Sequence, residues 1–200
     1  MQVFLCSTHN VTGEKLDALL EKLPPERAAL CQKGDGAAHG VGFLLVAHAA
    51  KHLDPNADTS RWVIEPGGKP HLPGDTVHFS LSHAGALIAV AVSKTHPVGV
   101  DIEKIRPHRE GFAARWFSPA EQAEIAAAKD PDVAMTLLWT KKEAAAKKCG
   151  TGLGFDLSRI DVAHTASSLL ELDGLRYALS LAPAEEIATP IWIELEDFTP

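Results

Sequence analysis

The stretch PVGVDIE, residues 97–103, alternates strictly between two kinds of side chain. The branched apolar set is Val98, Val100 and Ile102, and the set between them is Gly99, Asp101 and Glu103. A period of two is typical of a β-strand with one buried face. Two carboxylates therefore lie side by side on one face of this strand, next to a glycine, and such a pair of like charges needs a physical reason.

The composition of the chain is that of an ordinary globular protein. Its 200 residues are 46% apolar and 22% charged, which is enough for a sizeable core, and the net charge of -7 argues against a broad nucleic-acid-binding surface. Three cysteines without CxxC spacing favour neither a disulfide framework nor a zinc site, and they fit a reducing compartment. The N-terminus does not resemble a signal peptide, and the longest apolar run is about half of a membrane span. We therefore expect a cytoplasmic protein without a membrane segment.

Local patterns predict a repeated order of strands and helices. Strands are expected at 1–7, 77–83, 86–92, 97–103, 174–182 and 190–197, with shorter ones inside 61–75 and 151–162. Helices are expected at 13–32 (broken at Pro24 and Pro25), at 40–53, from 119 onward and at 132–149. Ser118 and Glu121 have the spacing of a capping box, and Gly150 is suited to end the last helix. Each half thus has a strand, a helical region and two or three strands, which predicts an α+β protein with largely antiparallel sheet.

The segment LWTKKEAAAKKCG, residues 138–150, carries a second group of charges. On a helix Trp139, Glu143 and Lys147 are four residues apart and share one face, with Lys142 about 100° away. A solvated ion pair is the usual interpretation of this spacing. Trp139 and the neighbouring alanines indicate instead a face that packs.

The two acidic segments together suggest a metal site. Asp101 and Glu103 from the strand and Glu143 from the helix offer three oxygen ligands, which suit Mg²⁺ better than zinc. Lys147, one turn beyond Glu143, would then be placed to contact a phosphate oxygen. The alternative is that Asp101 and Glu103 are solvated acids on an edge strand.

Two turns carry further polar groups. In FSLSHAG, residues 79–85, Ser82 and His83 end a strand, where a hydroxyl, an imidazole and backbone N–H groups can hold an anion. In GGKP, residues 67–70, Lys69 lies on a turn of fixed direction. Each motif alone is more often an ordinary surface turn.

Taken in order, GKP, FSLSHAG, VGVDIE, RWFSPAE and WTKKEAAAK resemble the 4′-phosphopantetheinyl transferases. The resemblance covers about residues 60–160, and it is nearest to the larger, monomeric kind that activates peptide and polyketide synthetases. Its most specific pieces are G-[VI]-D-[IL]-E and W-x-x-K-E-[AS]-x-x-K. It implies two similar α/β halves related by a pseudo-twofold axis, residues 1–97 and 98–200, with the active site in the cleft between them.

The resemblance also implies a reaction and its site. The reaction is Mg²⁺-dependent transfer of the 4′-phosphopantetheine arm of coenzyme A to a serine of an apo acyl or peptidyl carrier protein, with release of adenosine 3′,5′-bisphosphate. The implied metal ligands are Asp101, Glu103 and Glu143; the implied catalytic residues are Glu143, as general base, and Lys147. The implied coenzyme A contacts are Lys69, Ser82, His83, Lys142 and Lys147. Neither nucleic acid nor a membrane is expected as a partner.

The first half follows the pattern less closely. The segment 24–42 keeps Arg27, Lys33 and Asp35 but has His39 where the resemblance leads us to expect an arginine. Two alternatives stay open: a degenerate member that binds coenzyme A or a carrier protein without turnover, and a Mg²⁺-dependent phosphohydrolase. A basic patch for an acidic carrier helix is expected at Lys104, Arg106, Arg109 and Arg115.

Overall fold

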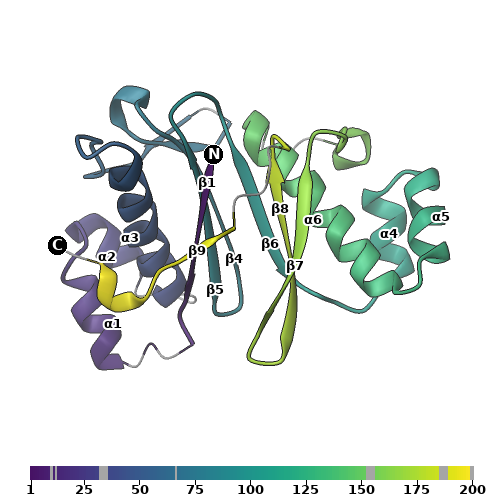
Figure 1. Ribbon diagram of the computed structural model, residues 1–200, viewed down its shortest axis with the longest axis horizontal. Coiled ribbons are helices and arrows are strands. Elements are labelled where there is room, and N and C mark those ends of the chain that lie inside the picture. Colours follow the sequence, from purple (N-terminus) through teal and green to yellow (C-terminus); the bar gives the residue numbers. More distant parts are fainter. Residues whose placement is uncertain are drawn as a thin grey trace.

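The computed structural model describes residues 1–9, 11, 13–31, 36–65, 67–151, 156–184 and 189–198. Its centre consists of two β-sheets (Figure 1). The first sheet contains, in order, β4 (His78–Ala84), β5 (Leu87–Ser93), β1 (Gln2–Ser7) and β9 (Ile191–Trp192). The second contains β6 (Gly99–Lys104), β8 (Leu175–Ala182) and β7 (Ala166–Leu172). A small third sheet pairs β2 (Val63–Ile64) with β3 (Pro70–His71). The α+β class and the largely antiparallel pairing are confirmed.

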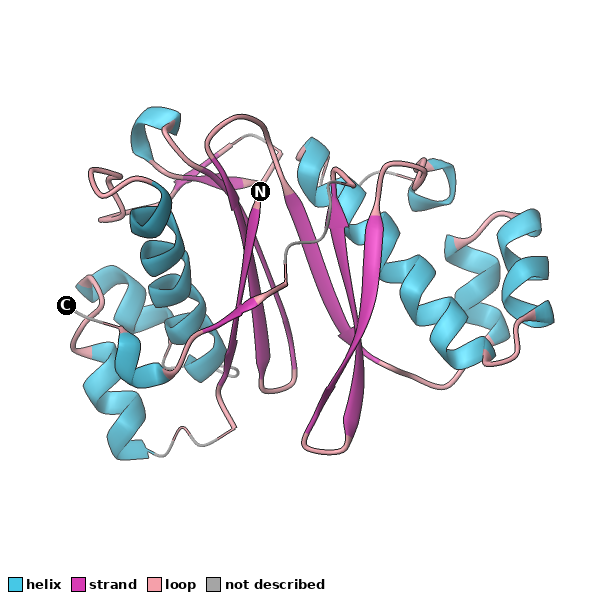
Figure 2. Ribbon diagram, in the orientation of Figure 1, coloured by secondary structure: helices cyan, strands magenta, loops and turns pink. Residues whose placement is uncertain are grey.

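Helices cover the outer faces of both sheets (Figure 2). The first sheet is covered by α3 (Gly36–Leu53), on which α1 (Gly13–Leu20) and α2 (Pro25–Leu30) pack. The second is covered by α6 (Pro131–Cys149), on which α5 (Pro119–Ala127) packs, with α4 (Glu110–Trp116) against α5. Single 3₁₀ turns follow at η1 (Pro73–Asp75), η2 (Leu157–Arg159) and η3 (Leu195–Asp197). In the described part of the chain, none of the helices combines the length and the apolar character that crossing a membrane requires.

Two apolar cores hold the sheets and α3 together, and a smaller third one joins α4, α5 and α6. One lies between the first sheet and α3, where Phe4, Phe79 and Val90 are buried against Leu45. The other lies between the two sheets and receives the whole apolar face of β6, namely Val98, Val100 and Ile102. The alternation in residues 97–103 therefore separates two faces of the strand. Its branched side chains face the first sheet, and its polar side chains face α6.

The predicted helix signals near α5 and α6 are confirmed. Ser118 Oγ accepts a hydrogen bond from the Glu121 N–H at 3.3 Å, and Glu121 Oε2 accepts one from the Ser118 N–H at 2.7 Å, which completes the capping box. Gly150 ends α6 with a φ of 70°, a left-handed conformation that glycine adopts without steric strain.

Other boundaries differ from the predictions. The helix expected at 40–53 begins at Gly36, and the strand expected at 190–197 shrinks to the two residues of β9. No strand occurs at 156–162, where η2 lies, and residues 152–155 are outside the described ranges. Both α4 and β7 escaped prediction: α4 is a short helix without a side-chain N-cap bond, and β7 is an edge strand with only partly buried residues.

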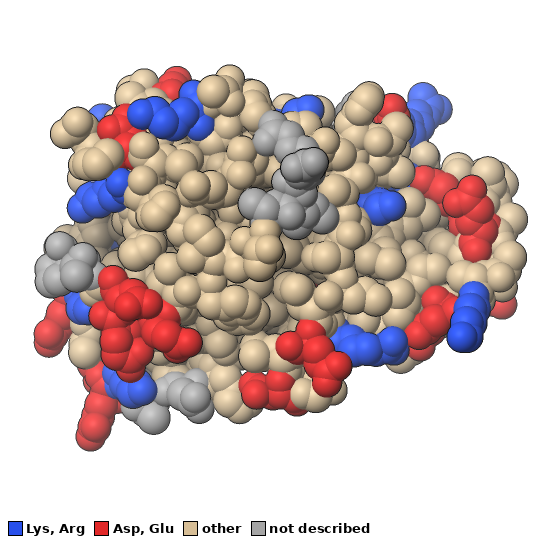
Figure 3. Space-filling view, in the orientation of Figure 1, with Lys and Arg blue, Asp and Glu red and all other residues tan. Residues whose placement is uncertain are grey.

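The C-terminal segment returns to the first sheet. β9 pairs in parallel with β1, aligning Phe4 with Ile191 and Leu5 with Trp192. Lys22 Nζ donates a hydrogen bond to the Phe198 carbonyl at 2.6 Å. The charged side chains on the face of the molecule that Figure 3 shows, by contrast, lie mainly around its margin. Residues 191–198 therefore pack on the sheet that contains β1, and a division at residue 97 stays a prediction.

Candidate active site

The glycine of β6 allows α6 to lie against the polar face of that strand. A Cβ atom at Gly99 would overlap the Ala144 carbonyl oxygen and would come within 2.7 Å of the Lys148 nitrogen, both in the backbone of α6. Only a residue without a side chain permits this approach. Because the helix is so close, Asp101 and Glu103 face side chains of α6 rather than solvent.

Asp101 lies at the centre of the site and is 4% exposed. Its Oδ1 accepts hydrogen bonds from Ser82 Oγ at 2.8 Å and from Lys147 Nζ at 2.7 Å. Lys147 Nζ also donates to Ser82 Oγ at 3.0 Å, so the three side chains form a closed network. Burial raises the pKa of the Asp101 carboxyl, and the Lys147 ammonium opposes that rise.

The other two acids complete a group of like charges. Burial raises the pKa of Glu143, which is 9% exposed, and the neighbouring Asp101 raises it further. Burial also raises the pKa of Glu103, against the influence of Arg106, whose Nη2 donates to Glu103 Oε2 at 2.7 Å. The nearby Trp139 side chain also lowers the pKa of Glu103. The three predicted metal ligands therefore lie within electrostatic reach of one another.

The donor set fits a hard cation such as Mg²⁺. No three His, Cys, Asp or Glu side chains of the described residues are arranged as a ready-made metal cluster. However, Asp101 Oδ2 and Glu143 Oε1 are both buried, and neither finds a hydrogen-bond partner within the described ranges. Unpaired buried carboxylate oxygens are energetically costly, and oxygen ligands are those that Mg²⁺ prefers. These two oxygen atoms are the positions at which a bound cation would supply the missing partner.

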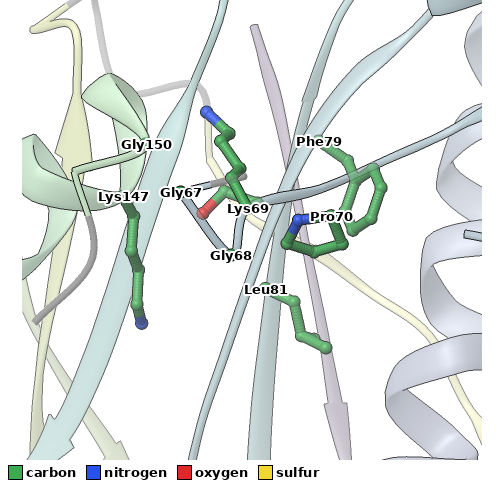
Figure 4. Close-up of a pocket in the computed structure, with 9 residues that line it drawn as sticks. Gly67, Gly68, Lys69, Pro70, Phe79, Leu81, Lys147 and Gly150 are labelled. Carbon is green, nitrogen blue, oxygen red and sulfur yellow. The ribbon is translucent and has the colours of Figure 1, made fainter. Parts of the chain in front are cut away.

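A pocket of about 370 Å³ lies beside this network, between α6 and the first sheet (Figure 4). Its lining is Gly67, Gly68, Lys69, Pro70, Phe79, Ser80, Leu81, Lys147 and Gly150. Lys69 Nζ donates to the Lys148 carbonyl at 2.9 Å and to the Val98 carbonyl at 3.2 Å, and burial lowers the pKa of Lys69. The structure thus brings Lys69 and Lys147 to one pocket, with Lys69 also tying its loop to the end of α6.

His83 lies at the end of β4 with its side chain exposed. Its ring is 5.9 Å, centroid to centroid, from that of His39 in the first turn of α3. The histidine found in place of the expected arginine is therefore a neighbour of a predicted coenzyme A contact. The Arg27 guanidinium stacks over Trp62 at 4.8 Å, while Lys33 and Asp35 fall outside the described residues.

The structure corrects the role predicted for Lys142. This side chain has no exposed surface, and its Nζ lies 2.9 Å from Glu121 Oε1 and donates to the Leu157 carbonyl at 2.8 Å. It also lies 5.8 Å from the centroid of the Phe117 ring. A lysine enclosed in this way cannot reach a nucleotide, because it points from α6 toward α5 rather than toward the pocket.

One contributor to the site, Ser80, received no role from the sequence. Ser80 Oγ accepts a hydrogen bond from the Val100 N–H at 3.0 Å, so Ser80 and Ser82 together fasten β4 of the first sheet to β6 of the second. The signal was present, because the two serines are two residues apart on a strand and share a face. What the alternation did not show is that this face meets another strand.

The chain is similar in sequence to known proteins. A family model described as the 4′-phosphopantetheinyl transferase superfamily matches residues 97–187. A 4′-phosphopantetheinyl transferase of Bacillus subtilis is 33% identical over 161 residues, covering 75% of this chain and 70% of the relative. The chain belongs to the 4′-phosphopantetheinyl transferase superfamily. The family resemblance read from the motifs is therefore confirmed.

Two further members of the superfamily are similar to the chain. The 4′-phosphopantetheinyl transferase Sfp of Bacillus subtilis (strain 168) is 29% identical over 161 residues, or 76% of this chain and 71% of the relative. The 4′-phosphopantetheinyl transferase AcpT of Salmonella typhimurium is 37% identical over 154 residues, or 74% and 73%. The range matched by the superfamily model contains Asp101, Glu103, Glu143 and Lys147, whereas Lys69, Ser82 and His83 precede it.

Proposed function

We propose that the protein transfers the 4′-phosphopantetheine arm of coenzyme A to a serine of an apo carrier protein, in a Mg²⁺-dependent reaction. The serine oxygen forms a bond to the phosphorus that carries pantetheine, and the bond from that phosphorus to adenosine 3′,5′-bisphosphate breaks. The observation that carries the proposal is the Asp101–Lys147 ion pair beside a pocket, next to the unpaired carboxylate oxygens of Asp101 and Glu143, in a member of this superfamily.

Glu143 is the proposed general base. A base must accept the proton that the carrier serine loses as its oxygen attacks, and a carboxylate with a raised pKa accepts it more readily. Burial and the nearby Asp101 raise the pKa of Glu143, and its Oε1 is without a partner among the described residues.

Lys147 is the proposed phosphate contact. Its side chain is 31% exposed and lines the pocket, so its ammonium is within reach of both Asp101 and a ligand. Phosphoryl transfer asks little covalent chemistry of a protein, and positioning and charge neutralisation supply most of the catalysis. Ser82, His83 and Lys69 are proposed to hold the rest of coenzyme A, and Lys142 is left out of this set.

Asp101, Glu103 and Glu143 are the residues that would hold Mg²⁺. The ion would offset the negative charge of the pyrophosphate during transfer. The chain's own part is to present carboxylate oxygens from β6 and α6, which the close contact at Gly99 keeps together.

The connectivity supports two related halves. In each, a first strand (β1 or β6) is followed by helices and a hairpin (β4–β5 or β7–β8), and it pairs antiparallel with the second hairpin strand. We propose that residues 1–97 and 98–200 are related by a pseudo-twofold axis, with the active site in the cleft between them. A single chain would then supply the whole site, and we propose that the protein acts as a cytoplasmic monomer.

The basic residues after β6 are the proposed docking surface for the acidic carrier. Lys104, Arg106 and Arg109 are exposed, and Arg115 stacks over Trp116 at 4.7 Å. Arg106 also pairs with Glu103, so reversing its charge would disturb the site itself. Lys104→Glu with Arg109→Glu is the cleaner test, and we expect a raised KM for the carrier with unchanged coenzyme A affinity.

The proposal is tested by incubating the protein with coenzyme A, Mg²⁺ and a panel of apo carrier proteins, and by measuring the intact mass of each carrier. We expect a mass gain of one phosphopantetheine, abolished by EDTA. Coenzyme A binding without a mass gain on any carrier would favour a degenerate binding module. Release of free phosphopantetheine without a carrier would favour a phosphohydrolase.

A further inference from the structure

A fully buried lysine needs an explanation when it belongs to no ligand site. Lys142 has no exposed surface, yet it lies on α6 directly before Glu143. Burying a charged pair seldom stabilises a protein more than well-packed apolar side chains do. The Lys142–Glu121 ion pair is therefore better explained by what it holds in place than by the stability it adds.

The pair joins three separate segments. Lys142 belongs to α6, Glu121 to the first turn of α5, and the Leu157 carbonyl that Lys142 also binds belongs to η2. Glu121 has a second partner, because its other carboxylate oxygen accepts the Ser118 N–H bond of the capping box. Directional bonds to three segments restrict their relative rotation more than apolar contact does.

The α4–α5 region that this pair holds borders a second pocket. Phe117, beneath the Lys142 ammonium, packs edge-to-face on Phe112 at 6.1 Å, and Phe112 packs on Trp139 at 4.9 Å. Trp139 and Glu103 line the same cavity. Phe112, Trp139, Arg106 and Arg109 line a cavity of about 200 Å³ next to Glu103, which we name the Trp139 pocket. In Figure 1, α4 and α5 lie at the end of the molecule remote from the first sheet, attached through α6.

We propose that the Lys142–Glu121 pair is a positioning device, which fixes the α4–α5 unit so that the Trp139 pocket and its arginines keep a constant orientation to Glu103 and Glu143. Its effect is on the carrier protein rather than on coenzyme A, because no residue that lines the 370 Å³ pocket belongs to α4 or α5. The proposal rests on the proposed transferase function for its kinetic part only.

The decisive variant is Lys142→Met combined with Glu121→Gln. Glutamine preserves the capping box, and methionine fills the space of the lysine stem without its charge. Because neither half of the pair is left as an uncompensated charge, the double variant should fold and melt near the wild type. Lys141→Met, the neighbouring lysine on α6, is the matched control.

We expect the double variant to raise the KM for the carrier by about fivefold to tenfold, the scale of coupling through packed networks. Coenzyme A affinity, measured by calorimetry, should be unchanged, and Lys141→Met should change neither quantity. Hydrogen exchange should be faster in residues 110–127 of the double variant, whereas exchange in the first sheet should match the wild type.

Wild-type carrier KM and wild-type exchange in the double variant would overturn the proposal, since the pair would then only stabilise. Loss of coenzyme A affinity in step with the carrier KM would overturn it as well. If the wild type modifies no carrier, the proposed function fails, and the exchange comparison still decides whether the pair fixes the α4–α5 unit.

Discussion

α6 carries two buried groups of charges, and they differ in how completely those charges are paired. On the side toward α5, Lys142 has a carboxylate at 2.9 Å, a carbonyl at 2.8 Å and an aromatic face. On the side toward β6, Lys147 faces three acids, and two of their oxygens are without a partner in the described structure. Completed pairing marks a structural element, whereas a surplus of buried negative charge marks a place that a ligand or ion can complete.

The largest expected effect comes from removing the base in the incomplete group. Glu143→Gln keeps the shape of the side chain but cannot accept a proton, so we expect transfer to a carrier to fall by about a thousandfold. Glu124→Gln, at an exposed position of α5, should retain the wild-type rate. The rates are compared by intact mass of the carrier, and a Glu143→Gln rate within tenfold of the wild type would remove Glu143 from the role of base.

Lys147 provides the next comparison, because it faces the site while Lys148 follows it on the same helix. Lys147→Met removes the ammonium that bonds Asp101 and lines the pocket, and we expect kcat/KM to fall by about a hundredfold. Lys148→Met should change it little, since Lys69 uses the Lys148 carbonyl rather than its side chain. Steady-state kinetics measure both variants. Equal losses of kcat/KM would show that the positive charge of α6 as a whole matters, rather than the position of Lys147.

Gly99→Ala would disturb only the incomplete group, by moving Glu143 and Lys147 of α6 away from Asp101 of β6. The new methyl group meets backbone atoms of Ala144 and Lys148, so we expect the free energy of unfolding to fall by about 1–3 kcal/mol. Gly111→Ala in α4 is the control: its added Cβ meets open space, and we expect a stabilisation of about 0.5–1 kcal/mol. Chemical denaturation measures both values, and similar values would contradict the close contact at Gly99.

The smallest effect concerns pH and magnesium. Burial raises the pKa of Asp101, Glu103 and Glu143 in the folded state, so the folded protein binds more protons than the unfolded chain. The stability contributed by these groups is therefore present below the ordinary carboxyl pKa and is lost as the pH rises through the raised values. Near neutral pH without metal, Glu143→Gln should raise the free energy of unfolding by about 0.5–1 kcal/mol.

Thermal melts of both proteins measure this prediction. Added Mg²⁺ should raise the Tm of the wild type, because it binds the folded state, and should raise that of Glu143→Gln much less. A wild-type Tm that is insensitive to Mg²⁺ would count against a metal held by these acids.

The structural features that were predicted correctly are those that depend on residues close together in the sequence. The strand at 97–103, the capping box of Ser118 and Glu121 and the stop at Gly150 were predicted correctly, because neighbouring residues determine each of them. β7 was missed because an edge strand that is only half-buried shows little alternation. The superfamily was recognised from the order of the motifs along the chain, which can be read without knowing any tertiary contact.

The assignments that failed or stayed incomplete depended on packing between distant segments. Lys142 and Lys147 lie on one helix, and the helical period alone does not say which of them faces α5 and which faces β6. The Lys147–Asp101 bond joins residues 46 positions apart, and the Ser80 bond to Val100 joins residues 20 apart.

The sequence by itself determined most of the helices and strands, the acids of β6 and the family of this protein. Only the tertiary structure decided which charges are paired and which are left open. The physical reason is that a charge's free energy depends on burial and on partners within a few ångströms, and packing alone brings those partners together.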